Sequence, residues 1–279
     1  MNSFQKIITV CFFILLYGCN SNNETSIYLE AEQSDKVLYN KGFQALNNGE
    51  FEVANEYFTQ LDVLHPSSKW AIKGQLMSGF SLYKQNKYEE AIFALNKFIN
   101  LNPNHKSLAY AYYLKGFSYY ERIPQVSRDQ ILSQKAKESF EELQNKFPES
   151  TYAKKSNQHL KLLNNQIAGH EMMVGKFYQK QKKYIAAVLR YKTILKKHKN
   201  SAQIPESIFR IIECYLSLGL KSESLKLTSL LYYNFPKTSW YKEAYNLMKE
   251  VNLNVNILEK LEKEKKINLK KTSFDELNF

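Results

Sequence analysis

The sequence predicts an all-α protein in which five helical hairpins follow one another as a solenoid. Glycines recur at Gly42, Gly79 and Gly116, and each is 37 residues from the next. The same offset separates two further pairs of residues: Ala54 and Ala91, Pro66 and Pro103. The chain has only 9 glycines and 6 prolines, so these residues mark turns in a mostly helical chain.

The spacing inside each unit gives a reason for the repeat. The glycine precedes the alanine by 12 residues, and the alanine precedes the proline by 12, as in Gly42, Ala54 and Pro66. This spacing is typical of tetratricopeptide (TPR) hairpins. Small residues on both helices let the two backbones approach closely, and proline ends the second helix because it cannot continue one. A glycine inside a helix costs about 1 kcal/mol, so its recurrence at one position indicates a packing role.

Three more units fit the same template. The third has 8 extra residues between its two helices, which predicts an expanded hairpin. In the fourth unit a lysine replaces the proline. The corresponding positions in these units are Gly116, Ala136 and Pro148, then Gly175, Ala187 and Lys199, then Ile212, Ser224 and Pro236.

A long helix is expected between the third and fourth units. Residues Thr151 to Gln181 carry apolar side chains at helical spacing without a proline, and Ser150 is a suitable N-cap. The segment Trp240 to Glu250 repeats the apolar pattern once more and is expected to cap the array. Arrays of this kind leave an extended concave surface to which partners bind.

The N-terminus has the pattern of an export signal. Lys6 precedes an apolar run from Ile7 to Tyr17, which is shorter than the ~20 residues of a membrane-spanning helix. Leu16-Tyr17-Gly18-Cys19 resembles a lipobox, in which the cysteine is lipidated and becomes the new N-terminus. An ordinary signal peptide that contains a cysteine is the alternative. The expected organisation is a signal peptide (1–18), a lipidated Cys19 with a tether (19–35), units 1–3 (36–149), units 4–5 with a capping helix (150–250) and a charged tail (251–279).

Composition favours a binding protein over an enzyme. The formal net charge is +12, but most lysines lie beside Glu and Asn, and only Lys260 to Lys271 form a dense basic run. We therefore expect solvated faces or attraction to a membrane surface, and no nucleic-acid partner. Cys214 lies in an apolar segment and is expected to be buried rather than nucleophilic. The histidines have no ligand-spaced partners, so we expect no metal site, cofactor or catalytic residue.

Several segments resemble the BamD family, also called ComL or YfiO. The resemblance covers Val37 to Tyr241 and includes Arg128-Asp129-Gln130 in the third-unit insertion. The other matching segments are Phe98-Ile99-Asn100-Leu101-Asn102-Pro103, Ala111-Tyr112-Tyr113-Leu114-Lys115-Gly116, Phe147-Pro148-Glu149-Ser150-Thr151-Tyr152-Ala153 and Glu171-Met172-Met173-Val174-Gly175-Lys176-Phe177-Tyr178.

This resemblance implies a lipid-anchored subunit of the β-barrel assembly (BAM) complex at the periplasmic face of the outer membrane. In that family the C-terminal hairpins bind a POTRA domain of the barrel protein BamA, beside other BAM subunits. Arg190 matches an arginine of that contact on the second helix of the fourth unit. The N-terminal hairpins of the family are associated with unfolded barrel substrates.

An outer-membrane strand alternates apolar and polar residues and often ends in an aromatic one, so an aromatic groove suits it. Tyr39, Phe43 and Tyr83 are the candidates for this groove. The alternative function is that of another periplasmic TPR lipoprotein, which coordinates cell-wall or envelope-constriction factors. Such a protein shares the repeat but lacks the inserted third hairpin.

Overall fold

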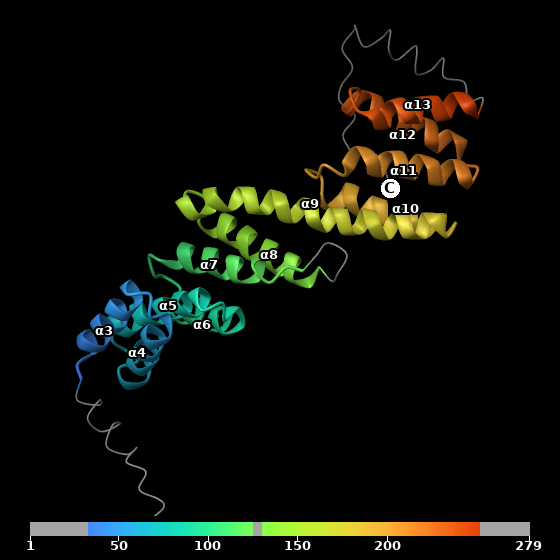
Figure 1. Ribbon diagram of the computed structural model, residues 1–279. Coiled ribbons are helices and arrows are strands. Elements are labelled where there is room, and N and C mark those ends of the chain that lie inside the picture. The colour runs from blue at the N-terminus through green and yellow to red at the C-terminus, as the bar shows by residue number, and fades with distance from the viewer. Residues whose placement is uncertain (1–32, 125–129, 252–279) are drawn as a thin grey trace, which may run out of the picture. The chain divides into compact units, whose positions relative to one another are not determined.

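The described part of the chain is entirely helical. The computed structural model describes residues 33–124 and 130–251, which form eleven α-helices and no strand (Figure 1). The helices pair as five hairpins: α3 (Asp35–Asn47) with α4 (Phe51–Leu64), α5 (Lys69–Lys84) with α6 (Tyr88–Leu101), α7 (Leu108–Tyr120) with α8 (Ile131–Lys146), α9 (Thr151–Lys180) with α10 (Tyr184–Lys197), and α11 (Ile204–Ser217) with α12 (Lys221–Asn234). A last helix, α13 (Ser239–Glu250), packs against α11 and α12. The predicted TPR-like α-solenoid of five hairpins with an expanded third one is confirmed.

The chain forms two compact units. The N-terminal unit, residues 1–102, contains α3 to α6, and α4 packs between α3 and α5. The C-terminal unit, residues 103–279, contains α7 to α13, and α11 packs between α10 and α12. The sequence analysis grouped the hairpins differently, with three in an N-terminal part and two in a C-terminal part. That grouping stays a prediction about which part of the chain binds which partner.

Local sequence signals set the helix boundaries. The Ser150 hydroxyl accepts a hydrogen bond from the Tyr152 amide at 3.1 Å, so the predicted N-cap begins the long, uninterrupted helix α9. Gly49 and Gly219 have φ values of 82° and 77° in the turns that join α3 to α4 and α11 to α12. Glycine suits these turns because it adopts positive φ without steric cost.

The recurring glycines bring the two helices of a hairpin into close contact. A Cβ atom added to Gly42 would lie 2.7 Å from Cε1 of Phe58, and one added to Gly116 would lie 2.5 Å from Cε1 of Phe140. In these two hairpins an aromatic ring fills the space that a side chain on the glycine would need, and Leu95 does so opposite Gly79 in the second hairpin. The repeat is therefore steric, as the sequence predicted.

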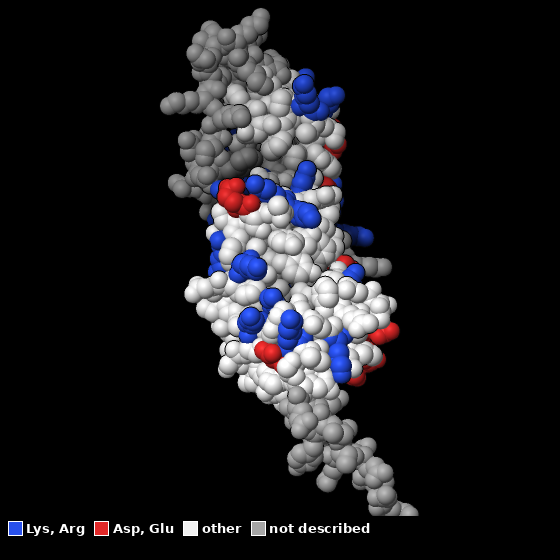
Figure 2. All heavy atoms as spheres, turned by 90° about the vertical axis from the view of Figure 1, so that its left-hand side faces the viewer, with Lys and Arg blue, Asp and Glu red and all other residues white. Residues whose placement is uncertain are grey.

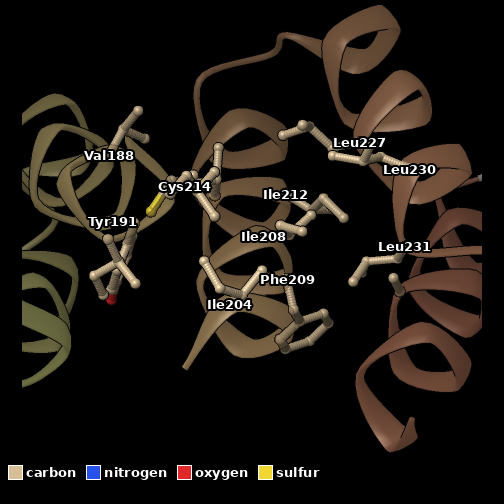
Figure 3. Packing of buried hydrophobic residues seen from close by; sticks show 14 of the residues in the cluster. Val188, Tyr191, Ile204, Ile208, Phe209, Ile212, Cys214, Leu227, Leu230 and Leu231 are labelled. Carbon is tan, nitrogen blue, oxygen red and sulfur yellow. The ribbon is translucent and has the colours of Figure 1, made fainter. Parts of the chain in front are cut away.

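The core of the C-terminal unit has α11 at its centre. Figure 3 shows Ile208 and Ile212 of α11 between side chains of α10 and α12. Cys214 is fully buried in this core and is a free thiol, as expected. Burial raises the pKa of the thiol to about 12, so it stays protonated and unreactive near neutral pH.

Some expectations concern residues outside the described ranges. They include Cys19 with its signal and tether, Arg128 and Asp129 of the third-hairpin insertion, and nearly all of the charged tail. Among the residues that the structure does describe, no helix is both long and apolar enough to cross a membrane.

Candidate partner-binding surfaces

An aromatic cluster lies on the first two hairpins of the N-terminal unit. The ring of Tyr39 on α3 stacks with that of Phe43 at a centroid distance of 6.1 Å. The ring centroids of Tyr39 and of Trp70 on α5 are 4.9 Å apart. The Lys73 ammonium is 4.4 Å from the centre of the Trp70 ring, at a distance suited to a cation–π contact. We call Tyr39, Phe43, Trp70 and Lys73 the aromatic cluster.

The members of this cluster differ in exposure. Tyr39 is partly buried and packs against the core around Leu38 and Leu61, and this burial raises the pKa of its hydroxyl. Phe43 is 43% exposed although it is a large apolar residue. Tyr39 therefore belongs partly to the core, whereas Phe43 is available for contact with another molecule.

Tyr83 lies in a different part of the same unit. Its ring packs edge-on against Tyr88 of α6, with centroids 5.7 Å apart. Tyr83 is 13 residues beyond Trp70, which places it about 20 Å further along α5 at 1.5 Å per residue. Of the three predicted groove residues, the structure thus brings Tyr39 and Phe43 together. Sequence reasoning missed Trp70 and Lys73, although their i, i+3 spacing places them on one helix face.

Arg190 lies on α10 and forms an ion pair within the chain. Its Nη1 atom is 3.3 Å from Oε2 of Glu171 on α9, and the two side chains are 46% and 17% exposed. Ile185 and Leu189, one turn apart on α10, are also exposed although both are apolar. Successive residues of a helix are about 100° apart, so these two apolar side chains lie on a different flank of α10 from Arg190. Arginine is enriched among the residues that dominate protein–protein contacts.

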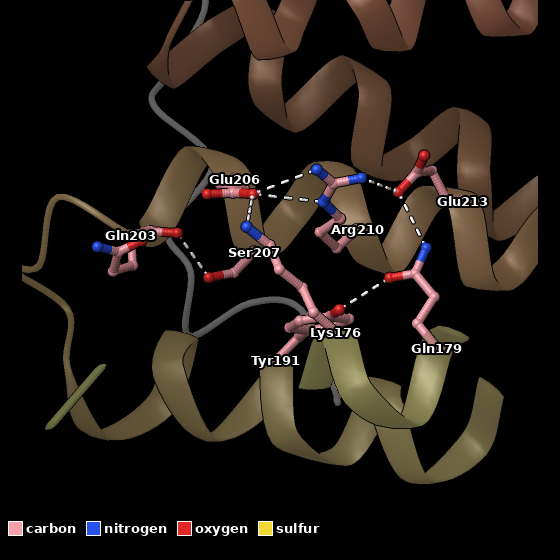
Figure 4. Close-up of polar contacts among 8 residues, drawn as sticks. All are labelled: Lys176, Gln179, Tyr191, Gln203, Glu206, Ser207, Arg210 and Glu213. Atoms are coloured by element: carbon pink, nitrogen blue, oxygen red, sulfur yellow. Dashed lines mark hydrogen bonds and ion pairs between the residues drawn. The ribbon is translucent and has the colours of Figure 1, made fainter. Parts of the chain in front are cut away.

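A polar network joins the fourth hairpin to the fifth (Figure 4). Its members are Lys176, Gln179, Tyr191, Glu206, Arg210 and Glu213. The guanidinium of Arg210 donates to Glu213 at 2.9 Å and to Glu206 at 3.3 Å. Lys176 of α9 pairs with the same Glu206 at 2.5 Å. The Arg210 pairs lie within α11, and the Lys176–Glu206 pair joins α9 to α11.

The amide of Gln179 completes this network. It donates to Glu213 at 3.0 Å and accepts from the Tyr191 hydroxyl at 2.8 Å. Three helices, α9, α10 and α11, are therefore connected through partly buried polar groups. Such a network favours one packing of the last two hairpins against each other.

These surfaces present aromatic and charged side chains. The described residues contain no group of three or more His, Cys, Asp or Glu side chains that could hold a metal ion. The aromatic cluster suits an apolar or aromatic side chain, and Arg190 suits a carboxylate. The fold defines a TPR-like helical-repeat protein.

Comparison with known proteins gives the family. The chain belongs to the YfiO family of outer membrane lipoproteins, which matches residues 31–231. A curated relative from Rickettsia prowazekii, called outer membrane protein assembly factor BamD, is 38% identical over 85% of this chain and 93% of its own length. The protein of the same name from Caulobacter vibrioides is 34% identical over 85% of this chain and 77% of its own length.

A solved TPR structure also aligns with the chain. The TPR2AB domain of yeast Sti1 has a TM-score of 0.38 and 15% identity, over 77% of this chain and 84% of that chain. Family membership rests on the sequence relatives alone.

Proposed function

We propose that this chain is a non-catalytic scaffold for the assembly of outer membrane proteins. The observation that carries the proposal is the family match over residues 31–231, because it spans all the helices of the N-terminal unit and most of those of the C-terminal unit. The relatives within that family are named assembly factors. A series of helical hairpins suits this task, since it displays separate surfaces for several partners.

The proposal includes a lipid anchor at Cys19, which would hold the chain at the periplasmic face of the outer membrane. Residues 19–35 would give the helical units reach from that surface. Mass spectrometry of the mature N-terminus tests this part. A diacylated Cys19 as the first residue is the expected result, and an N-terminus at any other residue would contradict it.

The proposed docking site for a BamA-like POTRA domain is the face of α10 around Arg190. The ion pair with Glu171 leaves nearly half of the Arg190 side chain exposed. A carboxylate of the partner can then share the same guanidinium, which has five N–H donors. The exposed Ile185 and Leu189 offer apolar area on the neighbouring flank of the same helix.

Co-purification with the BamA-like barrel protein tests this assignment. Arg190→Glu places a carboxylate against Glu171 and against the partner, so we expect capture to fall by about tenfold or more. Glu171→Gln removes the intrachain ion pair but keeps the arginine, and we expect it to leave capture intact. Lys183→Glu is the matched control, because it reverses an exposed charge at the start of the same helix.

The outcomes separate the two roles of Arg190. If Glu171→Gln weakens capture as much as Arg190→Glu does, the arginine serves the fold and not the partner. If the chain captures cell-wall synthesis factors and no barrel protein, the alternative role of an envelope coordinator is correct.

The proposed site for unfolded barrel substrates is the aromatic cluster of the N-terminal unit. The exposed ring of Phe43 can stack with the terminal aromatic residue of an outer-membrane strand. The ammonium of Lys73, held over Trp70, lies where it can attract the negative C-terminal carboxylate of such a strand.

A further inference from the structure

The C-terminal unit contains a hollow of about 710 Å³ where α8, α9 and the end of α10 meet. Its lining is unusually basic. The charged residues around it are Lys137, Lys161, Lys196, Lys197, Lys199 and Glu141. Figure 2 shows that basic side chains are widespread on one face of the molecule, but this hollow differs from such a surface because its lysines surround a concavity.

The lining of the hollow carries more lysines than carboxylates. Glu141 pairs with Lys137 of the same helix at 3.0 Å. Neither Lys161 nor Lys197 forms an ion pair with a described residue. Five lysines and one glutamate leave a formal charge of +4. Like charges that converge on one space raise the free energy of the empty site, and an anion removes that cost.

One wall of the hollow is held by a buried histidine. His198, directly after α10, is only 4% exposed, and its Nδ1 atom is 2.8 Å from Oδ1 of Asn164 on α9. Burial, with Lys137 and Lys197 nearby, lowers the pKa of this histidine, so the ring is neutral at neutral pH. Asn165 also accepts a hydrogen bond from the Ala202 amide at 3.0 Å. The segment that carries Lys196 to Asn200 is thus fixed against α9.

The opposite wall is held by a glutamine. Gln144 of α8 donates from Nε2 to Oδ1 of Asn157 on α9 at 2.6 Å. The same amide group lies 3.3 Å from the Ser156 hydroxyl. Both walls are therefore set before any ligand arrives, so binding does not have to order the backbone.

We propose that this hollow binds an anion that carries several phosphate groups. Lysine ammonium groups are compact point charges that suit phosphate oxygens, and the amides of Asn157 and Asn164 at the lining can add hydrogen bonds. A concave site that collects charge from three helices fits a compact cluster of phosphates better than an extended acidic chain. The phosphates can belong to a soluble anion or to neighbouring lipid headgroups.

Calorimetric titration of the full chain with inorganic pyrophosphate tests the proposal directly. The double variant Lys161→Gln/Lys197→Gln removes one charge from each of two walls, and we expect binding to weaken about tenfold. The control Lys180→Gln/Lys183→Gln removes two exposed charges from the far end of the same hairpin and should leave binding unchanged. Equal weakening in both variants, or no binding by the unaltered chain, would overturn the proposal.

A second variant is expected to bind pyrophosphate more tightly, which a misfolded protein would not do. Glu141→Gln removes the acidic residue of the lining and releases Lys137 from its ion pair. Pyrophosphate should then bind several-fold more tightly, and unchanged or weaker binding would contradict the assignment.

Two further measurements identify the source of the phosphates. Flotation with phosphatidylcholine vesicles, with or without phosphatidylglycerol, shows whether the Lys161/Lys197 variant also loses attachment to anionic headgroups. A loss indicates headgroups, and retained attachment with weakened pyrophosphate binding indicates a soluble anion. A hexaglutamate peptide that binds the hollow more tightly than pyrophosphate would show that it takes acidic segments, and the proposal would be wrong. None of these measurements needs the barrel protein, so they are independent of Arg190.

Discussion

Gly175 on α9 faces the ring of Tyr191 on α10 so closely that a methyl group on the glycine would overlap the ring. An added Cβ atom would lie 2.8 Å from both Cδ1 and Cζ of Tyr191. The ring cannot easily move away, because the Tyr191 hydroxyl donates to Gln179 at 2.8 Å. In the fifth hairpin the larger side chain is on the first helix. Ile212 occupies the position equivalent to Gly175, Thr228 occupies the position equivalent to Tyr191, and both are fully buried.

We expect Gly175→Ala to destabilise the C-terminal unit by roughly 1–3 kcal/mol through overpacking. The substitution gains about 1 kcal/mol of helix propensity, so the steric cost has to exceed that gain. Urea unfolding followed by circular dichroism measures the difference. Gly74→Ala is the control, since its Cβ would come no closer than 3.1 Å to Cδ2 of Leu61 and 3.5 Å to Cδ1 of Phe58. If the two variants are equally stable, close approach does not explain the recurring glycine.

Arg210 is expected to stabilise the junction between the fourth and fifth hairpins. Arg210→Leu leaves the carboxylates of Glu206 and Glu213 without their shared partner, and we expect a loss of about 1–3 kcal/mol in the free energy of unfolding. The triple variant that also carries Glu206→Gln and Glu213→Gln should recover part of the loss. A triple variant no more stable than the single one would show that Arg210 acts through packing on Phe209 and Trp240 instead.

Stability should fall as the pH drops below about 6.5. The pKa values of His198 and His159 are lowered from 6.5, mainly by burial, so the unfolded chain binds more protons than the folded chain in the window just below 6.5. Protonation therefore favours unfolding as the pH falls through that window. Urea midpoints measured between pH 7.5 and 5.5 should decrease for the unaltered chain and decrease less for His198→Gln. An identical slope in both proteins would show that His198 does not contribute.

Phe43 is expected to contribute to substrate binding. A synthetic peptide of an outer-membrane strand with a C-terminal aromatic residue should bind the full chain, and Phe43→Ala should weaken it about five- to tenfold, as expected when a partly exposed aromatic anchor is lost. Fluorescence anisotropy of a labelled peptide measures the affinity. Phe93→Ala on α6 is the control, because Phe93 is 74% exposed and lies outside the aromatic cluster. Equal effects of the two substitutions would refute the role of the cluster.

The hairpins and their order could be predicted from the sequence alone. The rule is local: a small residue at one position and a large residue 16 positions later, as in Gly175 and Tyr191, must face each other once the chain turns back. The N-cap at Ser150 and the burial of Cys214 follow from equally local patterns. Steric and hydrogen-bonding requirements of this short range can be recognised within a single segment of the sequence.

The surfaces were decided by the tertiary structure. Arg190 could be selected from the sequence, but its pairing with Glu171 depends on which faces of α9 and α10 meet. Tyr83 has the same side chain as Tyr39 yet lies apart from the aromatic cluster, because its distance along α5 separates them. Lys161 and Lys197 are far apart in the sequence and line one hollow. Charge and aromatic surfaces arise from the rotation and packing of whole helices, which no single segment encodes.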